Sequence, residues 1–258
     1  MKLEITFPNV VQRDRTVVLA SVGILTTLAW VYIVHLANKS LQMSGAMAMP
    51  AMNGWGAADF YFMFVMWAVM MIAMMLPSAT PMILIFEKIC EKRKSEQQPF
   101  VPTTIFVAGY LFVWIGFSVF ATALNWLLHV GGQLSSMMGH TPPTIGGVIL
   151  VAAGVFQWTP LKQTCLKHCR SPISFLMTNW REGAVGAMKM GIHHGSYCLG
   201  CCWMLMVLLF VLGVMNLAWV AVLTIVVLLE KVLPGEKWLS RIIGASLVIW
   251  GGWLIVLA

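Results

Sequence analysis

Long apolar segments separated by short polar connections are the feature that most constrains the fold of this chain. Of its 258 residues, 60% are hydrophobic and only 10% are charged, which is more apolar surface than a soluble domain can bury. We therefore predict an all-α fold, a polytopic transmembrane helical bundle of about seven spans. The expected spans cover residues 16–37, 59–86, 103–130, 144–161, 186–212, 214–230 and 241–257. The fourth is the shortest, and the count falls to six if the sixth and seventh segments fold as one re-entrant unit.

Basic residues predict the orientation of these helices. In the seven-span arrangement, 15 of the 16 lysine and arginine residues fall on one side, and Lys39 alone falls on the other. Because basic residues concentrate in cytoplasmic connections, the N-terminus is predicted to be cytoplasmic and the C-terminus to lie outside. The net charge of +7 is then a topology signal and a contact surface for anionic lipid, and nucleic acid is not an expected partner. We expect a bacterial-type cytoplasmic (inner) membrane.

The chain is expected to form a single integral-membrane domain over residues 1–258. Within it, residues 1–58 would form an anchor helix followed by an outer loop, and residues 59–258 would form a six-helix region. The apolar stretch of the anchor is too long for the central part of a cleaved signal peptide, and no clear cleavage site follows it. We therefore expect this first helix to be retained.

Methionine is concentrated on the outer side and along the second span. The outer loop offers four possible outer metal ligands, namely Met43, Met47, Met49 and Met52. In the second span, methionines recur every three or four residues and so share one helix face: Met63, Met66, Met70 and Met74, with a neighbouring row of Met71, Met75 and Met82. Thioethers are soft ligands that suit Cu(I), but a methionine stripe at helical spacing is also ordinary packing.

Five of the six cysteines are gathered in two short motifs. The first is Cys165-x3-Cys169, and the second is Cys198-x2-Cys201-Cys202. His194 and the three cysteines of the second motif are spaced i, i+4, i+7 and i+8, so they share one face of a helix. Gly191 and Gly195 lie on or beside that face and would let a neighbouring helix approach closely.

Two facing helices that each present thiolates could close a metal site, and we predict that the two motifs meet. The candidate ligands are Cys165, Cys169, His194, Cys198, Cys201 and Cys202, and the metal would be copper, as Cu(I), or zinc. Thiol redox chemistry and plain packing of small side chains remain alternatives. His193 lies off the shared face and Cys90 is isolated, so neither is a candidate.

Glu230, near the inner end of the sixth span, is a possible functional carboxylate. Apolar residues precede it and Pro234-Gly235 follow it. The alternative is an interfacial ion pair with the adjacent Lys231, which would contribute little to stability. The sequence contains no catalytic triad, phosphate-binding loop, haem motif or carboxylate dyad. We therefore do not expect an enzyme.

Three segments resemble those of a known family. They are Met71-Ile-Ala-Met-Met-Leu-Pro77, the stretch from Gln157 to Pro172 that carries the first cysteine motif, and His194-Gly-Ser-Tyr-Cys-Leu-Gly-Cys-Cys-Trp203. With Glu230-Lys231, they resemble a family of predicted metal-binding integral membrane proteins, a domain of unknown function often labelled as a copper chaperone. The resemblance covers roughly residues 60 to 257. It implies metal binding at Cys165, Cys169, Cys198, Cys201 and Cys202.

Copper handling or delivery is the function that these observations favour. One alternative is an accessory or structural subunit of a membrane enzyme complex, such as a copper-dependent monooxygenase. A second is a membrane thiol oxidoreductase, which the expected inner position of the cysteines disfavours. The expected partners are the lipid bilayer and either a copper-dependent membrane enzyme or other membrane subunits.

Overall fold

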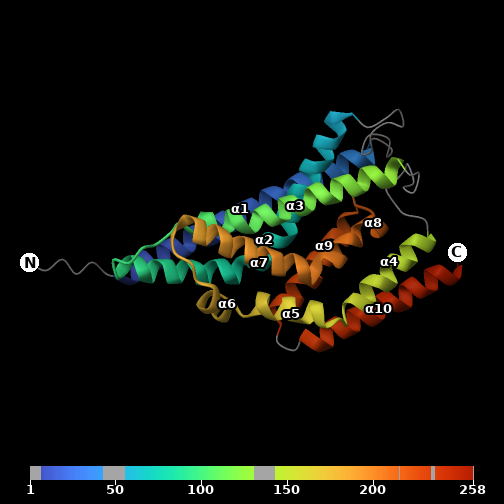
Figure 1. Ribbon diagram of the computed structural model, residues 1–258. Helices are drawn as coiled ribbons and strands as arrows, with labels where there is room; N and C mark the ends of the chain where they lie inside the picture. The colour runs from blue at the N-terminus through green and yellow to red at the C-terminus, as the bar shows by residue number, and fades with distance from the viewer. Residues whose placement is uncertain (1–6, 43–55, 131–142, 215, 234–235, 258) are drawn as a thin grey trace, which may run out of the picture.

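The computed structural model describes residues 7–42, 56–130, 143–214, 216–233 and 236–257, and these residues are almost entirely helical (Figure 1). The prediction of an all-α fold is confirmed over these ranges, which contain no strand. The helices are α1 (Phe7–Gln42), α2 (Ala57–Ser95), α3 (Thr103–Val130), α4 (Pro143–Phe156), α5 (Pro160–Arg170), α6 (Pro172–Asn179), α7 (Gly183–Val207), α8 (Leu209–Leu212), α9 (Leu217–Val232) and α10 (Glu236–Leu257).

Five helical segments within the described ranges are long and apolar enough to cross a membrane. They are Arg15–Lys39, Ala57–Ser95, Thr103–Leu128, Gly183–Leu212 and Trp238–Leu257, and they coincide with the predicted first, second, third, fifth and seventh spans. The bent pair α4 and α5 makes a sixth if it counts as one span. Helix α9, the predicted sixth span, has 16 residues and therefore a length of about 24 Å, short of a hydrocarbon core of about 30 Å. The described helices therefore support five or six spans, and the side on which the N-terminus lies stays a prediction.

The predicted fourth span is broken near its end. Helix α4 ends at Phe156, and α5 begins at Pro160 with its axis bent by 62°. Proline disfavours helical backbone in the residue before it, and Thr159 is accordingly extended, with φ −68° and ψ 146°. The Thr159 side chain then accepts a hydrogen bond from the Lys162 backbone N–H at 3.4 Å, which caps the new helix. The first cysteine motif consequently lies on a short helix of its own and not on an extension of α4.

Glycines set two close helix contacts. Helix α7 packs against α3, and a Cβ on Gly191 would clash with the Phe106 carbonyl oxygen and lie 3.0 Å from the Tyr110 nitrogen. A Cβ on Gly195 would lie 3.0 Å from Val113 Cγ2. The predicted close approach at these glycines is confirmed, with α3 as the neighbouring helix.

The second glycine contact joins α4 and α10, which lie side by side in Figure 1. A Cβ on Gly147 would lie 2.8 Å from the Gly251 carbonyl oxygen, and a Cβ on Gly251 would lie 2.6 Å from the Gly147 carbonyl oxygen. The two backbones therefore touch, and no side chain larger than hydrogen fits between them without a shift.

Helix α2 supplies much of the core. Its predicted methionine stripe is buried throughout: Met63, Met66, Met70, Met71, Met74, Met75 and Met82. Beside Pro77, Ser78 Oγ donates to the Met75 carbonyl at 2.8 Å, and Thr80 Oγ1 donates to the Leu76 carbonyl at 3.4 Å. Both hydroxyls therefore hydrogen-bond to backbone carbonyls in this proline-containing stretch. The candidate outer ligands Met43, Met47, Met49 and Met52 lie outside the described residues.

Candidate metal centre

Helix α7 presents the second cysteine motif to the interior as one buried face. Cys198, Cys201 and Cys202 are at most 2% exposed, and His194 is 3% exposed. Their spacing of four, three and one residues accounts for this arrangement, because a helix advances about 100° per residue. The predicted shared face of α7 is confirmed.

The first cysteine motif meets this face. The thiol of Cys169 lies within hydrogen-bonding range of the sulfur atoms of both Cys198 and Cys201. Cys165 Sγ lies against α7 at Gly200, where an added Cβ would come within 2.9 Å of it. Helices α5 and α7 therefore bring the two motifs together, as predicted. We call Cys169, Cys198, Cys201 and Cys202 the thiol centre.

The thiols of α7 are engaged in hydrogen bonds within the protein. Cys201 Sγ donates to the Cys198 carbonyl at 3.1 Å, and Cys202 Sγ donates to the same carbonyl at 2.9 Å. Cys202 Sγ also lies 4.0 Å from Met75 Sδ on α2. Across the described ranges, no three His, Cys, Asp or Glu side chains are already arranged to hold a metal ion. Ligation would therefore require rotation of these thiols away from the carbonyl, which a cysteine side chain achieves by a change of one rotamer.

Cys198 has two further polar neighbours from other helices. Lys231 Nζ on α9 lies 2.9 Å from Cys198 Sγ and 2.8 Å from Ser78 Oγ. Tyr110 Oη on α3 lies 3.1 Å from Cys198 Sγ and donates to the Met75 carbonyl at 3.0 Å. Three helices, α2, α3 and α9, therefore border the thiol centre besides α5 and α7, which carry its cysteines.

Sequence reasoning did not find these neighbours. The sequence suggests Lys231 only as an ion-pair partner of Glu230, although adjacent residues of a helix point about 100° apart and do not face each other. Tyr110 and Ser78 carry no metal-binding signature. Lys231 is a charged residue in the last turn of an otherwise apolar helix, and this position could have marked it as a candidate functional residue.

His194 lies beside the thiol centre among aromatic rings. Its ring stacks on Phe106 and Tyr110, with centroids 6.1 Å and 5.8 Å away, and meets the edge of Phe175 at 5.6 Å. Its Nδ1 atom is buried and has no hydrogen-bond partner among the described residues. A buried ring nitrogen without a partner offers its lone pair in one of the two neutral tautomers, which is compatible with the predicted role of His194 as an additional ligand.

Glu230 belongs to a separate group of polar side chains. Both of its carboxylate oxygens accept hydrogen bonds from Lys162 Nζ at 2.7 Å, and Oε1 also accepts one from Ser240 Oγ at 3.1 Å. Gln157 Oε1 accepts a further bond from Lys162 Nζ. We call Lys162, Glu230, Gln157 and Ser240 the ion-pair cluster. The alternative pairing of Glu230 with Lys231 is wrong, and a functional role for the carboxylate stays a prediction.

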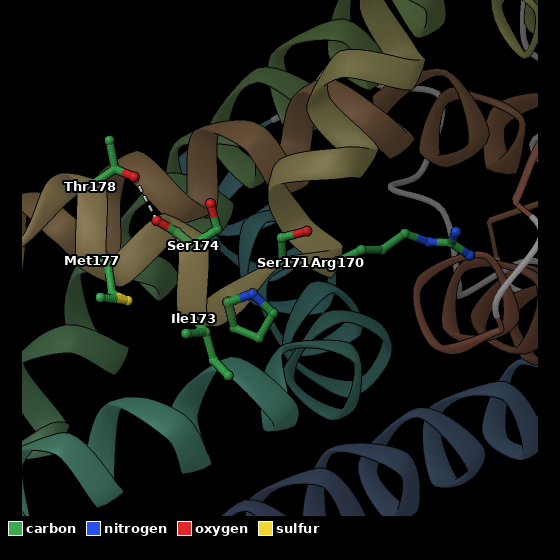
Figure 2. A pocket seen from close by; sticks show the side chains of 7 residues that line it. Arg170, Ser171, Ile173, Ser174, Met177 and Thr178 are labelled. Atoms are coloured by element: carbon green, nitrogen blue, oxygen red, sulfur yellow. Dashed lines mark hydrogen bonds between the residues drawn. The ribbon is translucent and has the colours of Figure 1, made fainter.

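An open pocket of about 570 Å³ lies where α5 passes into α6 (Figure 2). Its lining is Arg170, Ser171, Pro172, Ile173, Ser174, Met177 and Thr178. The pocket contains no cysteine or histidine, and within it Thr178 Oγ1 donates to the Ser174 carbonyl at 2.7 Å. The thiol centre is therefore a buried site between helices and is distinct from this surface hollow.

One comparison with known proteins gave a match. The family model described as PpoB2, copper chaperone, matches residues 64–254. This range contains both cysteine motifs, Lys231 and the ion-pair cluster. It begins after α1 and after the methionine-rich segment that follows α1 in the sequence. Searches of the curated proteins and of the solved structures found no match.

Proposed function

The chain belongs to the PpoB2 copper chaperone family, and from this premise we propose that it is an integral membrane protein that binds Cu(I) at the thiol centre and delivers it to a partner. The five long apolar helices are compatible with membrane insertion, and we place the protein in a bacterial-type cytoplasmic membrane. The copper-related role comes from the family. The ligands, the membrane and the delivery step are the proposal.

The observation that carries the proposal is the meeting of thiols from two separate helices. Cys169 on α5 contacts Cys198 and Cys201 on α7, so residues far apart in the sequence offer sulfur atoms to one point. Cu(I) is a soft cation that prefers thiolate and thioether ligands. Met75 Sδ, 4.0 Å from Cys202 Sγ, adds a thioether beside the thiols. Such a mixed sulfur set favours copper over zinc, which binds thiolate and imidazole but not thioether in structural sites.

The redox state of the cysteines fits a metal-handling role. All six cysteines are free thiols, and all six lie within the described residues. Free thiols at hydrogen-bonding range can give up their protons and accept a metal ion, whereas a disulfide offers no thiolate. A delivery protein also needs a site that releases its metal. Thiols that are already satisfied by the Cys198 carbonyl can return to those bonds when copper leaves.

The proposed recipient is a copper-dependent membrane enzyme. Copper would be acquired at Met43, Met47, Met49 and Met52, since thioethers bind Cu(I) weakly enough to pass it on to thiolates. This part of the proposal rests on ligand type.

The test is the metal content of the purified full-length protein. Chains loaded with Cu(I) under reducing conditions and desalted should retain about one copper per chain. The double variant Cys198→Ser, Cys201→Ser should retain less than about a tenth of that amount, because serine keeps the size of the side chain and removes the soft ligand. Cys90→Ser is the matched control, since Cys90 is also a buried cysteine but contacts none of the thiol centre.

Equal copper in the wild type and the double variant would contradict the proposed ligands. A protein that never holds copper but co-purifies with an enzyme would support the alternative of an accessory subunit.

A further inference from the structure

We propose that Lys231 sets the charge of the thiol centre and makes it selective for a monovalent over a divalent metal ion. The inference rests on the proposed binding of copper at Cys198, and it adds the residue that distinguishes Cu(I) from Zn(II). It starts from the environment of the lysine and proceeds through the charge of the loaded site.

Lys231 brings a positive charge to the thiol centre without a carboxylate to offset it. Its Nζ atom lies 2.8 Å from the neutral hydroxyl of Ser78 and 2.9 Å from Cys198 Sγ. None of the ion pairs found in the described part of the chain includes Lys231. The sulfur of Cys198 is therefore the group beside Lys231 that can offset its charge, by binding as a thiolate.

The geometry keeps a bound metal close to this charge. A metal–thiolate bond is about 2.3 Å long, so a metal on Cys198 would lie within about 5 Å of Nζ in the observed position of the lysine. The ammonium would repel the metal at this distance, and the repulsion is twice as strong for a divalent ion as for a monovalent one.

The charge balance of the loaded site follows. When the metal binds, Cys198 and Cys201 each release a proton to solvent and become thiolates. Two thiolates, one Cu(I) and the Lys231 ammonium sum to zero, whereas the same groups with Zn(II) carry an uncompensated positive charge. An uncompensated charge is unfavourable at a site that is removed from water. The attraction between the lysine and the thiolates is common to both metals and cancels in their ratio.

Removing the charge of Lys231 should therefore change the preference between Cu(I) and Zn(II) in a defined direction. Lys231→Gln retains a hydrogen-bond donor for Ser78 but leaves the Cu(I) site with a net negative charge and the Zn(II) site neutral. Ser78→Asp neutralises the same lysine by a different route, because it places a carboxylate beside Nζ. Both variants should lower the preference for Cu(I) over Zn(II) by at least about tenfold, given one unit of charge at about 5 Å in a medium of intermediate dielectric.

The experiment measures the affinity of the full-length protein for Cu(I) and for Zn(II) separately, each in competition with a coloured chelator. Lys231→Arg keeps the charge and should keep a ratio near that of the wild type. Lys189→Gln is the matched control, because it removes a lysine from an exposed position on α7 and should change the ratio by less than about twofold.

Two different results overturn two different statements. If wild-type protein binds Cu(I) through Cys198 and the ratio is unchanged in Lys231→Gln or Ser78→Asp, the role of Lys231 is refuted while the proposed function stands. If the wild type and Cys198→Ser bind Cu(I) equally, the proposed site fails and the inference fails with it. Lys231→Gln removes a positive charge and Ser78→Asp adds a negative one beside it. The test therefore stays decisive if one of the two variants does not fold.

Discussion

Two lysines on neighbouring helices have different kinds of partner. Lys162 lies in the ion-pair cluster, where Glu230 binds it through both carboxylate oxygens at 2.7 Å. Lys231 faces the thiol centre, where its neighbours are Cys198 Sγ and Ser78 Oγ. The partner of the first lysine and the second lysine itself are consecutive residues of α9. Because successive helical residues point about 100° apart, Glu230 contacts the ion-pair cluster while Lys231, on the same turn, contacts the thiol centre.

The two regions differ in what their cation does: one stabilises the packing of helices, and the other acts on a neighbouring binding site. Lys162 is fully buried, and Glu230 cancels its charge, so the pair connects α5 to α9 and Ser240 adds α10. Among the described residues Lys231 forms no ion pair, so under the inference above its charge acts on the metal that Cys198 Sγ binds. We therefore expect substitutions in the ion-pair cluster to change stability and substitutions at the thiol centre to change metal binding.

The largest expected effect is on stability, in the ion-pair cluster. Lys162→Met should lower the free energy of unfolding by about 3–5 kcal/mol, because it leaves Glu230 as a buried charge without its partner. The double variant Lys162→Met, Glu230→Leu should recover most of that loss, since it removes both charges together. Unfolding of the protein in mixed micelles, followed by circular dichroism, gives both values.

This pair of variants also separates the two regions. Folded Lys162→Met, Glu230→Leu protein should retain wild-type copper content. A loss of copper in that stable double variant would mean that Glu230 takes part in metal binding, and the division between the regions would be wrong.

The second effect concerns the two glycine contacts. Gly191→Leu should destabilise the protein by at least about 1–3 kcal/mol, since its side chain would force α7 away from α3 at the Phe106 carbonyl. It should also reduce copper affinity, because Tyr110 on α3 would move away from Cys198 on α7. Gly147→Leu, in the contact between α4 and α10, should destabilise to a similar degree.

The copper affinity of the folded fraction distinguishes these glycine variants. It should fall in Gly191→Leu and stay at the wild-type value in Gly147→Leu, as measured by chelator competition on protein purified by size exclusion. Similar losses in both would show that the thiol centre depends on the whole bundle and not on the α3–α7 contact.

The sequence was sufficient for features that depend on helical periodicity alone. The buried face of Cys198, Cys201 and Cys202 follows from spacing, and the contact at Gly191 follows from the lack of a side chain. The break before Pro160 also has a local cause, the proline itself, although the predicted span runs to residue 161 and crosses it.

Features that depend on the rotation of one helix against another were beyond the sequence. Lys162 and Glu230 are separated by 68 positions, and nothing local pairs them. The direction of Lys231 depends on which face of α9 packs against α7, and this is set by tertiary packing.

The third effect is at the hydroxyl of Tyr110. Tyr110→Phe removes one hydrogen bond to the Met75 carbonyl and one contact with Cys198 Sγ while keeping the ring against His194. We expect a loss of about 1 kcal/mol in stability and a few-fold change in Cu(I) affinity, since one neutral hydrogen bond contributes about that much. Calorimetric titration of Cu(I) against the variant and against Ser118→Ala, a buried hydroxyl on the same helix, would separate the two contributions.

The smallest expected effect is at Met75, and it tests whether a thioether belongs to the copper site. Met75→Leu preserves apolar volume, so the stability should change by less than about 1.5 kcal/mol. If Met75 Sδ, 4.0 Å from Cys202 Sγ, takes part in binding, Cu(I) affinity should fall a few-fold while Zn(II) affinity stays the same, because zinc has little affinity for thioethers. Met74→Leu is the matched control, as Met74 is equally buried on the same helix. X-ray absorption of the copper-loaded protein would check the assignment independently, since loss of one sulfur neighbour in Met75→Leu but not in Met74→Leu is the expected signature. Identical spectra and affinities in both variants would reduce Met75 to a packing residue and leave a centre composed of thiols alone.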